Sequence, residues 1–221
     1  MNRFSRPLRI LVYQDLLCAW CYVANARLSL LRREFAEAVQ WTFRPFPLRI
    51  SEGIPSQKEV SRRVKDVERA RLESEGKRLR ADLWTGGDPP RSSIPALVAL
   101  EAARLQGAHA HRALTKAMQR AALEQGVNVS RPDVAIELAS SIGLNMNRFM
   151  AAYQSAQTRQ LVLEEYRVAG ERGVNGVPTL VIGERWMISG LRELSEYRRH
   201  ILSCMGKLGM STGGSPESML H

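Results

Sequence analysis

The sequence predicts an α/β sandwich that is interrupted by a long helical segment. Three observations support this fold class: a β-α-β pattern at the start of the chain, about a hundred middle residues without a strand pattern, and an α-β-β-α pattern in the last third. With 221 residues, the chain can form one large domain or a small domain with an insertion. Hydrophobic residues make up 44% and charged residues 24% of it, which is typical of a protein with a packed core.

The first three elements form the β-α-β unit. Leu8–Tyr13 is a short apolar, partly β-branched run that predicts a buried strand. From Cys18 to Phe35, apolar residues recur at helical spacing. Val39–Phe43 alternates and is rich in β-formers, so it predicts a second strand. Two strands joined by one helix should be parallel with a right-handed crossover.

The middle of the chain, residues 56–155, carries a series of amphipathic helix patterns and no strand pattern. Pro95 suits the first turn of one of these helices, and Gly143 suits the end of another. We therefore expect an all-helical insertion domain.

The last third returns to mixed structure. A helix is predicted over residues 158–172, a hairpin over Pro178–Ile188, and a final helix from Leu191 to about Met205. The predicted organisation is therefore a domain made of residues 1–55 and 156–208, the insertion at 56–155, and a disordered tail at 209–221.

The charge balance is strongly basic, with 32 basic and 22 acidic residues and a net charge of +10. Such a balance invites a nucleic-acid hypothesis. However, the 27 arginines are scattered with glutamates between them, and no five consecutive residues carry the same charge. We therefore expect a solvated arginine-rich surface and no nucleic-acid partner.

The chain has no apolar run near the ~20 residues that a membrane span needs, which predicts no membrane association. Near the N-terminus, the apolar run Ile10–Tyr13 is four residues long, whereas a secretory signal needs roughly 7–15. The expected localisation is cytoplasmic.

Two of the three cysteines form the motif Cys18-Ala19-Trp20-Cys21 at the predicted strand-to-helix junction. At the first turn of a helix, unpaired N–H groups and the helix dipole favour the thiolate form of the first cysteine. Such a pair suits reversible thiol–disulfide exchange. The alternatives are two ordinary buried thiols or half of a zinc site. No second C-x-x-C and no histidine pair with ligand spacing accompanies the motif, so no metal site is expected.

A second motif, Gly176-Val177-Pro178-Thr179, directly precedes a predicted strand. The residue types allow either a trans proline that enters an edge strand or a cis Val177–Pro178 bond.

The two motifs together resemble a known family. D-L-L-C-A-W-C-Y (Asp15–Tyr22), a helical insertion, and G-V-P-T-L-V-I-G (Gly176–Gly183) look like the DsbA family, most of all its cytoplasmic FrnE-like branch. The resemblance covers about Leu8 to Ile201. It implies a thioredoxin fold interrupted by a helical insertion domain, thiol–disulfide oxidoreductase or isomerase activity, and a cis-proline at Pro178 that faces the cysteines.

The resemblance also implies roles for individual residues. Cys18 would be the exposed nucleophile, Cys21 the resolving thiol, and the backbone of Val177 a partner for an extended substrate in the loop that continues through Pro178 and Thr179. Where the family usually has proline after the first cysteine, this chain has Ala19, so the direction of the redox reaction stays open.

Three other residues have alternative roles. Trp20 would form an apolar lip for the substrate or pack against the insertion domain. Asp15 would assist proton transfer from Cys21 or, as its more expected role, lie exposed in a turn. Cys204 is expected to be a structural or surface thiol.

The expected partners are thiol- or disulfide-containing peptides or small thiols. No bound cofactor is implied, although glutathione would serve as a redox partner. The exposed helices of the insertion would also allow a homodimer. Two other functions compete: a glutathione-dependent isomerase resembling 2-hydroxychromene-2-carboxylate isomerase, which typically has serine where Cys18 stands, and a non-catalytic binding module.

Overall fold

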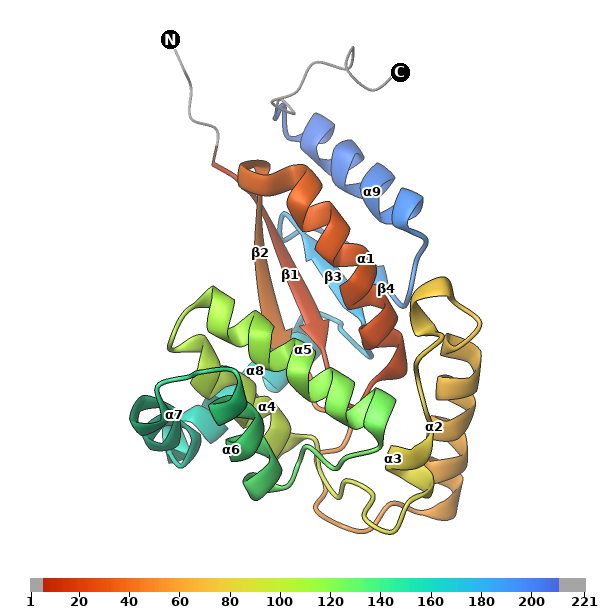
Figure 1. Cartoon of the computed structure of the whole chain (residues 1–221). Helices are drawn as coiled ribbons and strands as arrows, with labels where there is room; N and C mark the ends of the chain where they lie inside the picture. Colours follow the sequence, from red (N-terminus) through yellow and green to blue (C-terminus); the bar gives the residue numbers. More distant parts are fainter. Residues whose placement is uncertain (1–5, 211–221) are drawn as a thin grey trace.

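The computed structural model describes residues 6–210 and has a four-stranded mixed sheet with helices on both faces (Figure 1). The strand order is β2-β1-β3-β4. The first pair is parallel and the other two pairs are antiparallel, which confirms the predicted crossover and hairpin. The strands are β1 (Leu8–Gln14), β2 (Val39–Pro45), β3 (Thr179–Ile182) and β4 (Trp186–Ser189).

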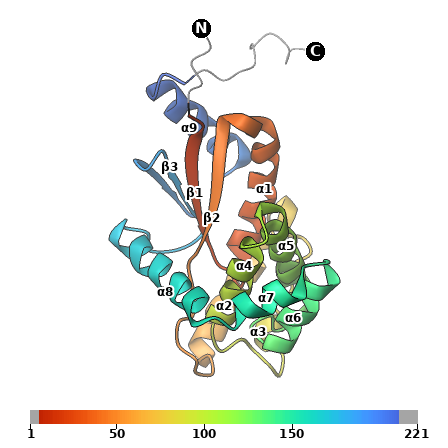
Figure 2. The same ribbon diagram turned by 90° about the vertical axis from the view of Figure 1, so that its left-hand side faces the viewer.

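Two helices cover one face of the sheet and one helix covers the other. Helices α1 (Ala19–Phe35) and α9 (Leu194–Lys207) share a hydrophobic core with the side chains of one sheet face. Helix α8 (Ala156–Glu171) contributes Ala169 to a smaller core on the opposite face, and Figure 2 shows it on the far side of the sheet from α1. This arrangement confirms a thioredoxin-like sandwich around the β-α-β unit.

Residues 57–153 contain only helices and connecting turns, as expected for an all-helical insertion (Figure 1). No helix between residues 6 and 210 is both long and apolar enough to cross a membrane. After β2, the chain passes through α2 (Gln57–Ala70), η2 (Ser74–Gly76), α3 (Asp82–Thr85), α4 (Ile94–Arg104), α5 (Ala108–Gln125), α6 (Pro132–Ser141) and α7 (Met146–Tyr153).

The insertion shares its core with the start of α1. Leu16, Leu17 and Val23 belong to the same buried cluster as Leu97 of α4 and Phe149 of α7. Because these side chains are almost completely buried, the segment around the first cysteine motif is held by the insertion as well as by the sheet.

Two predicted boundaries need comment. Helix α9 begins at Leu194, three residues later than predicted, because Glu193 and Glu196 form a capping box that fixes its first turn. Of the predicted tail at 209–221, residues 211–221 lie outside the described part of the chain.

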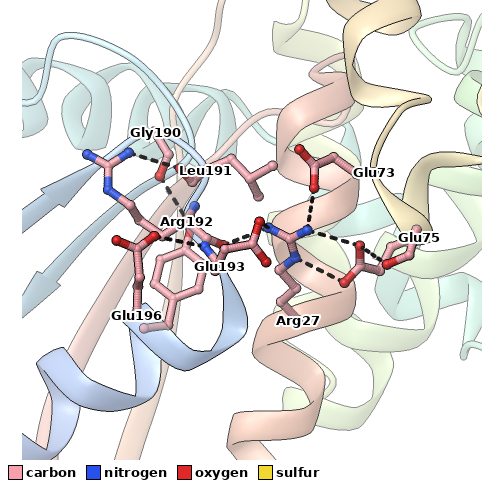
Figure 3. A network of polar contacts seen from close by, with 10 residues as sticks. Arg27, Glu73, Glu75, Gly190, Leu191, Arg192, Glu193 and Glu196 are labelled. Atoms are coloured by element: carbon pink, nitrogen blue, oxygen red, sulfur yellow. Dashed lines mark hydrogen bonds and ion pairs between the residues drawn. The ribbon is translucent and has the colours of Figure 1, made fainter.

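A buried arginine joins α1 to two distant segments (Figure 3). The side chain of Arg27 is 4% exposed and pairs with Glu73 and Glu75 at η2. It also donates a hydrogen bond of 2.8 Å to the carbonyl of Arg192, just before α9. The guanidinium thus ties α1, the insertion and the last helix together.

Candidate active site

The end of β1 places Cys18 at the N-cap of α1. The residue is extended, with φ −95° and ψ 112°, and its Sγ accepts a hydrogen bond of 3.2 Å from the backbone N–H of Cys21. The sulfur therefore satisfies one of the free N–H groups of the helix and lies at the positive end of its dipole.

Cys21 lies one turn further into α1 and is completely buried. Burial, together with the neighbouring Cys18 sulfur, raises the pKa of the Cys21 thiol well above its usual value. All three cysteines of the chain, including Cys204, are free thiols in this structure. The two members of the motif thus have different environments: a capping sulfur at the helix end and a protonated thiol behind it.

The second motif lies against the first, although 159 positions separate them in the sequence. The Val177–Pro178 peptide bond is cis. The Cys18 thiol donates to the Val177 carbonyl at 3.6 Å. The loop is fixed from the other side because the Gly190 N–H donates a bond of 2.8 Å to the Pro178 carbonyl. The structure therefore brings Cys18 and Val177 into contact.

Cys18 opens into a small pocket of about 140 Å³. Its exposed fraction is 5%, so it is buried and not the exposed residue that the resemblance implied. The loop at Val177 and α2 of the insertion line the pocket around it, and the local sequence does not reveal the position of α2. The pocket is lined by Leu17, Cys18, Ala19, Trp20, Leu48, Arg63, Asp66, Val67, Gly176 and Val177.

The other predicted binding residues have different surroundings. Trp20 lines the pocket, and its indole N–H donates a bond of 3.2 Å to Asp66 of α2. It therefore contacts the insertion, as one of its two predicted positions requires, and its role as a lip for the substrate stays a prediction. Thr179 is fully buried, and its hydroxyl donates to the Gly176 carbonyl at 2.7 Å. Thr179 thus shapes the loop instead of lining the pocket.

Asp15 is buried, and the expectation that it lies exposed in a turn is wrong. Its carboxylate accepts hydrogen bonds from the backbone N–H groups of Leu17 at 2.8 Å and Leu48 at 2.6 Å. Burial raises the pKa of this carboxyl above its usual value. Its charge acts on the Cys21 thiol and is one of the smaller causes that raise the pKa of that thiol.

Sequence reasoning missed the α2 side of the pocket. Arg63 is 7% exposed, and its guanidinium lies 5.7 Å from the ring centroid of Trp84. Its Nε has no hydrogen-bond partner in the described part of the chain. Asp66 follows on the next turn of the same helix. In the sequence, both belong to an ordinary amphipathic helix pattern, and no local signal distinguishes them.

Cys204 lies in α9, within the core that α9 shares with α1 and the sheet. Burial raises the pKa of its thiol. The residue is a buried structural thiol, one of the two expected forms.

Comparisons with known proteins agree with this fold. The ClpXP adapter protein SpxH of Halalkalibacterium halodurans is 24% identical over 201 residues, which cover 89% of this chain and 65% of the relative. The chain thus spans slightly less than two thirds of that relative's length. A putative protein disulfide isomerase from Nitrosomonas europaea superposes with a TM-score of 0.79 at 18% identity, over 91% of this chain and 98% of the other. The cytosolic disulfide reductase DsbM from Pseudomonas aeruginosa gives 0.70 at 19% identity, over 91% and 100%.

These structural likenesses concern the fold. Family membership follows from the sequence itself, because the family model for the DSBA-like thioredoxin domain matches residues 9–202, most of the chain. The protein therefore belongs to the DSBA-like thioredoxin domain family.

Proposed function

We propose that the protein is a thiol–disulfide oxidoreductase in which Cys18 is the nucleophile and Cys21 the resolving thiol. The observation that carries this proposal is the arrangement of the two sulfurs: Cys18 caps α1 and reaches the pocket, whereas Cys21 is sealed behind it. A pair that differs in access and in environment suits two consecutive attacks.

In the first step, the Cys18 thiolate attacks one sulfur of a substrate disulfide. A new S–S bond joins Cys18 to that sulfur, and the second substrate sulfur leaves as a thiolate that takes up a proton. In the resting state the Cys18 thiol donates to the Val177 carbonyl, and the N–H groups at the helix N-terminus would stabilise the negative charge on the sulfur once this proton has left.

In the second step, the Cys21 thiolate attacks Cys18 Sγ and releases the remaining substrate thiol. The enzyme is left with a Cys18–Cys21 disulfide, and the substrate has gained two electrons and two protons. Because the Cys21 thiol has a raised pKa, this step needs a proton acceptor. Asp15 is buried beside Cys21 and has a raised pKa of its own, so its carboxylate is suited to take that proton.

The pocket suggests the substrate class. A space of about 140 Å³ takes one thiol-bearing side chain and not a large ligand. Peptides with an exposed cysteine, or small thiols, fit this limit, and the backbone of Val177 would pair with the extended segment. Two glutathione molecules would reduce the Cys18–Cys21 disulfide and restore the starting state. We propose that the protein works in the cytoplasm, where a glutathione pool is present.

Trapping of the mixed disulfide tests this function. Cys21→Ser should accumulate a mixed disulfide between Cys18 and a disulfide substrate such as insulin, because no second thiol resolves it. Cys18→Ser should form no adduct and lose insulin reduction, while Cys204→Ser, the matched control, should behave as the unmodified protein. Mass spectrometry identifies the adduct. An adduct through Cys204 instead of Cys18 would refute the assignment.

A non-catalytic binding function is the competing proposal, and the name of the SpxH relative, an adapter protein, favours it. The same variants separate the two functions. If insulin reduction is absent from the unmodified protein and no variant forms an adduct, the cysteines have no exchange function and the binding role is preferred.

A further inference from the structure

A second and larger cavity of about 550 Å³ lies between α1 and α5, over the end of β1 and the adjacent part of β2. Both helices lie on the same side of the sheet in Figure 1. This α1–α5 cavity shares no lining residue with the Cys18 pocket. Its lining residues are Gln14, Tyr22, Asn25, Ala26, Ser29, Arg32, Phe43, Arg78, His111, Arg112, Thr115, Lys116, Gln119, Arg120 and Glu124.

The inner wall of the cavity holds an unused hydrogen-bond donor. The Asn25 amide donates to Gln14 Oε1 at 2.7 Å and to Gln119 Oε1 at 3.3 Å. These bonds fix the orientation of the Gln119 amide, and its Nε2 has no hydrogen-bond partner within residues 6–210, although the exposed fraction of Gln119 is only 5%. A buried donor without a partner is rare in proteins and points to a group that accepts from it.

A neutral histidine lies in the same wall. His111 is 6% exposed, and its ring centroid lies 6.2 Å from that of Phe43. Burial, and then the charges of Arg104, Arg112 and Arg32, together lower the pKa of His111 to about 4. The Arg32 guanidinium lies 5.5 Å from the Phe43 centroid, and its own pKa is lowered by burial and by Arg112. Arg104 is paired with Glu101, whereas Arg32 and Arg112, which line the cavity, form no ion pair with any residue between 6 and 210.

Among all the residues that line the cavity, positive charges also outnumber carboxylates. Glu124 is the one carboxylate among the lining residues, and it already accepts a hydrogen bond of 2.9 Å from the Tyr22 hydroxyl and lies 4.0 Å from Arg78. Within residues 6–210, the remaining cations of the lining form no ion pair. They are Arg32, Arg112, Lys116 and Arg120.

We propose that the α1–α5 cavity binds a small organic anion with at least two negative charges, of the phosphate-ester or polycarboxylate type. Its charged groups would pair with the arginines at the Arg32–Arg112 end, and an acceptor atom would satisfy Gln119 Nε2. Its uncharged part would lie against Phe43 and His111. The volume is within the range of ordinary ligand sites. The site does not depend on the redox proposal, because it uses neither Cys18 nor Cys21.

Isothermal titration calorimetry tests the site with two probes. Inorganic pyrophosphate represents the phosphate class of ligand and citrate the polycarboxylate class, so the two titrations show which class the cavity prefers. We expect saturable 1:1 binding of at least one probe in low-salt buffer. The double variant Arg32→Gln/Arg112→Gln should weaken it by about tenfold or more. The matched control is Arg69→Gln/Arg91→Gln, which removes the same charge from two exposed arginines outside the cavity. The proposal is overturned if neither probe binds. It is also overturned if the control variant loses as much affinity for the probe as the Arg32→Gln/Arg112→Gln variant.

A titration of the unmodified protein gives a second test that needs no arginine variant. A bound anion offsets the field of Arg32 and Arg112, so a saturating probe should move the pKa of His111 upward from about 4. The ring signals of His111, assigned with His111→Gln, report this shift in NMR spectra recorded across pH. An unchanged titration curve at saturating probe would contradict binding in this cavity.

Discussion

At the scale of single residues, the main feature is a set of buried ionisable groups whose pKa values are shifted by burial. Asp15 and Cys21 are both almost fully buried, and burial raises the pKa of each. In the proposed exchange reaction, this would keep the proton on Cys21 until a mixed disulfide forms at Cys18. His111 behaves in the opposite way, because burial favours the neutral form of a base and lowers its pKa.

The first prediction concerns His111. The folded protein protonates it near pH 4 and the unfolded chain near pH 6.5, so protons favour unfolding between these values. Its contribution to stability is complete above pH 6.5 and is lost as the pH falls toward 4. The free energy of unfolding should drop by about 2–3 kcal/mol from pH 7 to 4.5 through this residue, and His111→Gln should remove that part of the drop. Urea unfolding at both pH values checks it. Parallel losses in the two proteins would contradict this assignment.

At the scale of elements, α1 is the centre of the molecule. Its N-terminal end holds Cys18 and Cys21, its side chains pack on the sheet, and Arg27 ties it to η2 and to the start of α9. Because the Arg27 guanidinium is buried, its removal leaves Glu73, Glu75 and the Arg192 carbonyl without their partner.

We therefore predict that Arg27→Met lowers the free energy of unfolding by about 2–4 kcal/mol. The matched control is Arg198→Met, which breaks the more exposed pair between α9 and Glu34 and should cost less than about 1 kcal/mol. Chemical denaturation of both variants measures the difference. If both variants lost the same free energy of unfolding, the buried Arg27 network would stabilise the protein no more than the exposed Arg198–Glu34 pair does.

The strands and most helices of the fold follow from the sequence, because their patterns are local. The run Leu8–Tyr13 and the helix that ends at Phe35 match β1 and α1 almost residue by residue. The start of α9 does not, because the capping box at Glu193 overrides the apolar spacing that begins at Leu191.

The site is only half predictable in this way. The two motifs identified Cys18, Cys21 and the Val177 loop, but the α2 side of the pocket has no sequence signal, since it depends on how the insertion packs. The burial of Asp15 was missed for a related reason. Carboxylates are normally exposed, and one of the N–H groups that satisfies this one comes from Leu48, 33 positions along the chain.

At the scale of the whole molecule, the insertion and the N-terminal end of α1 share one core. Leu16, Leu17 and Val23 pack in the same cluster as Phe149 of α7. A disturbance in the insertion should therefore reach the cysteines, although no residue of α7 lines their pocket.

This coupling gives a prediction for Phe149→Ala, which removes a fully buried ring from the insertion. We expect a loss of about 3–5 kcal/mol in the free energy of unfolding. In a urea titration, tryptophan fluorescence and the accessibility of Cys21 to a thiol reagent should change together, at a lower midpoint than in the unmodified protein. If Cys21 kept its original midpoint while fluorescence shifted, the two parts would unfold separately and the shared core would carry no coupling.

The most direct test of the central claim is the equilibrium of the protein with glutathione buffers of varied redox ratio, read by mass spectrometry after rapid alkylation. The proposed function predicts a reversible loss of two hydrogens, localised to a Cys18–Cys21 disulfide, along a curve for a two-electron couple. Its midpoint also gives the direction of the reaction, which Ala19 leaves open. A protein that forms no disulfide at any ratio, or forms one only with Cys204, would contradict the claim.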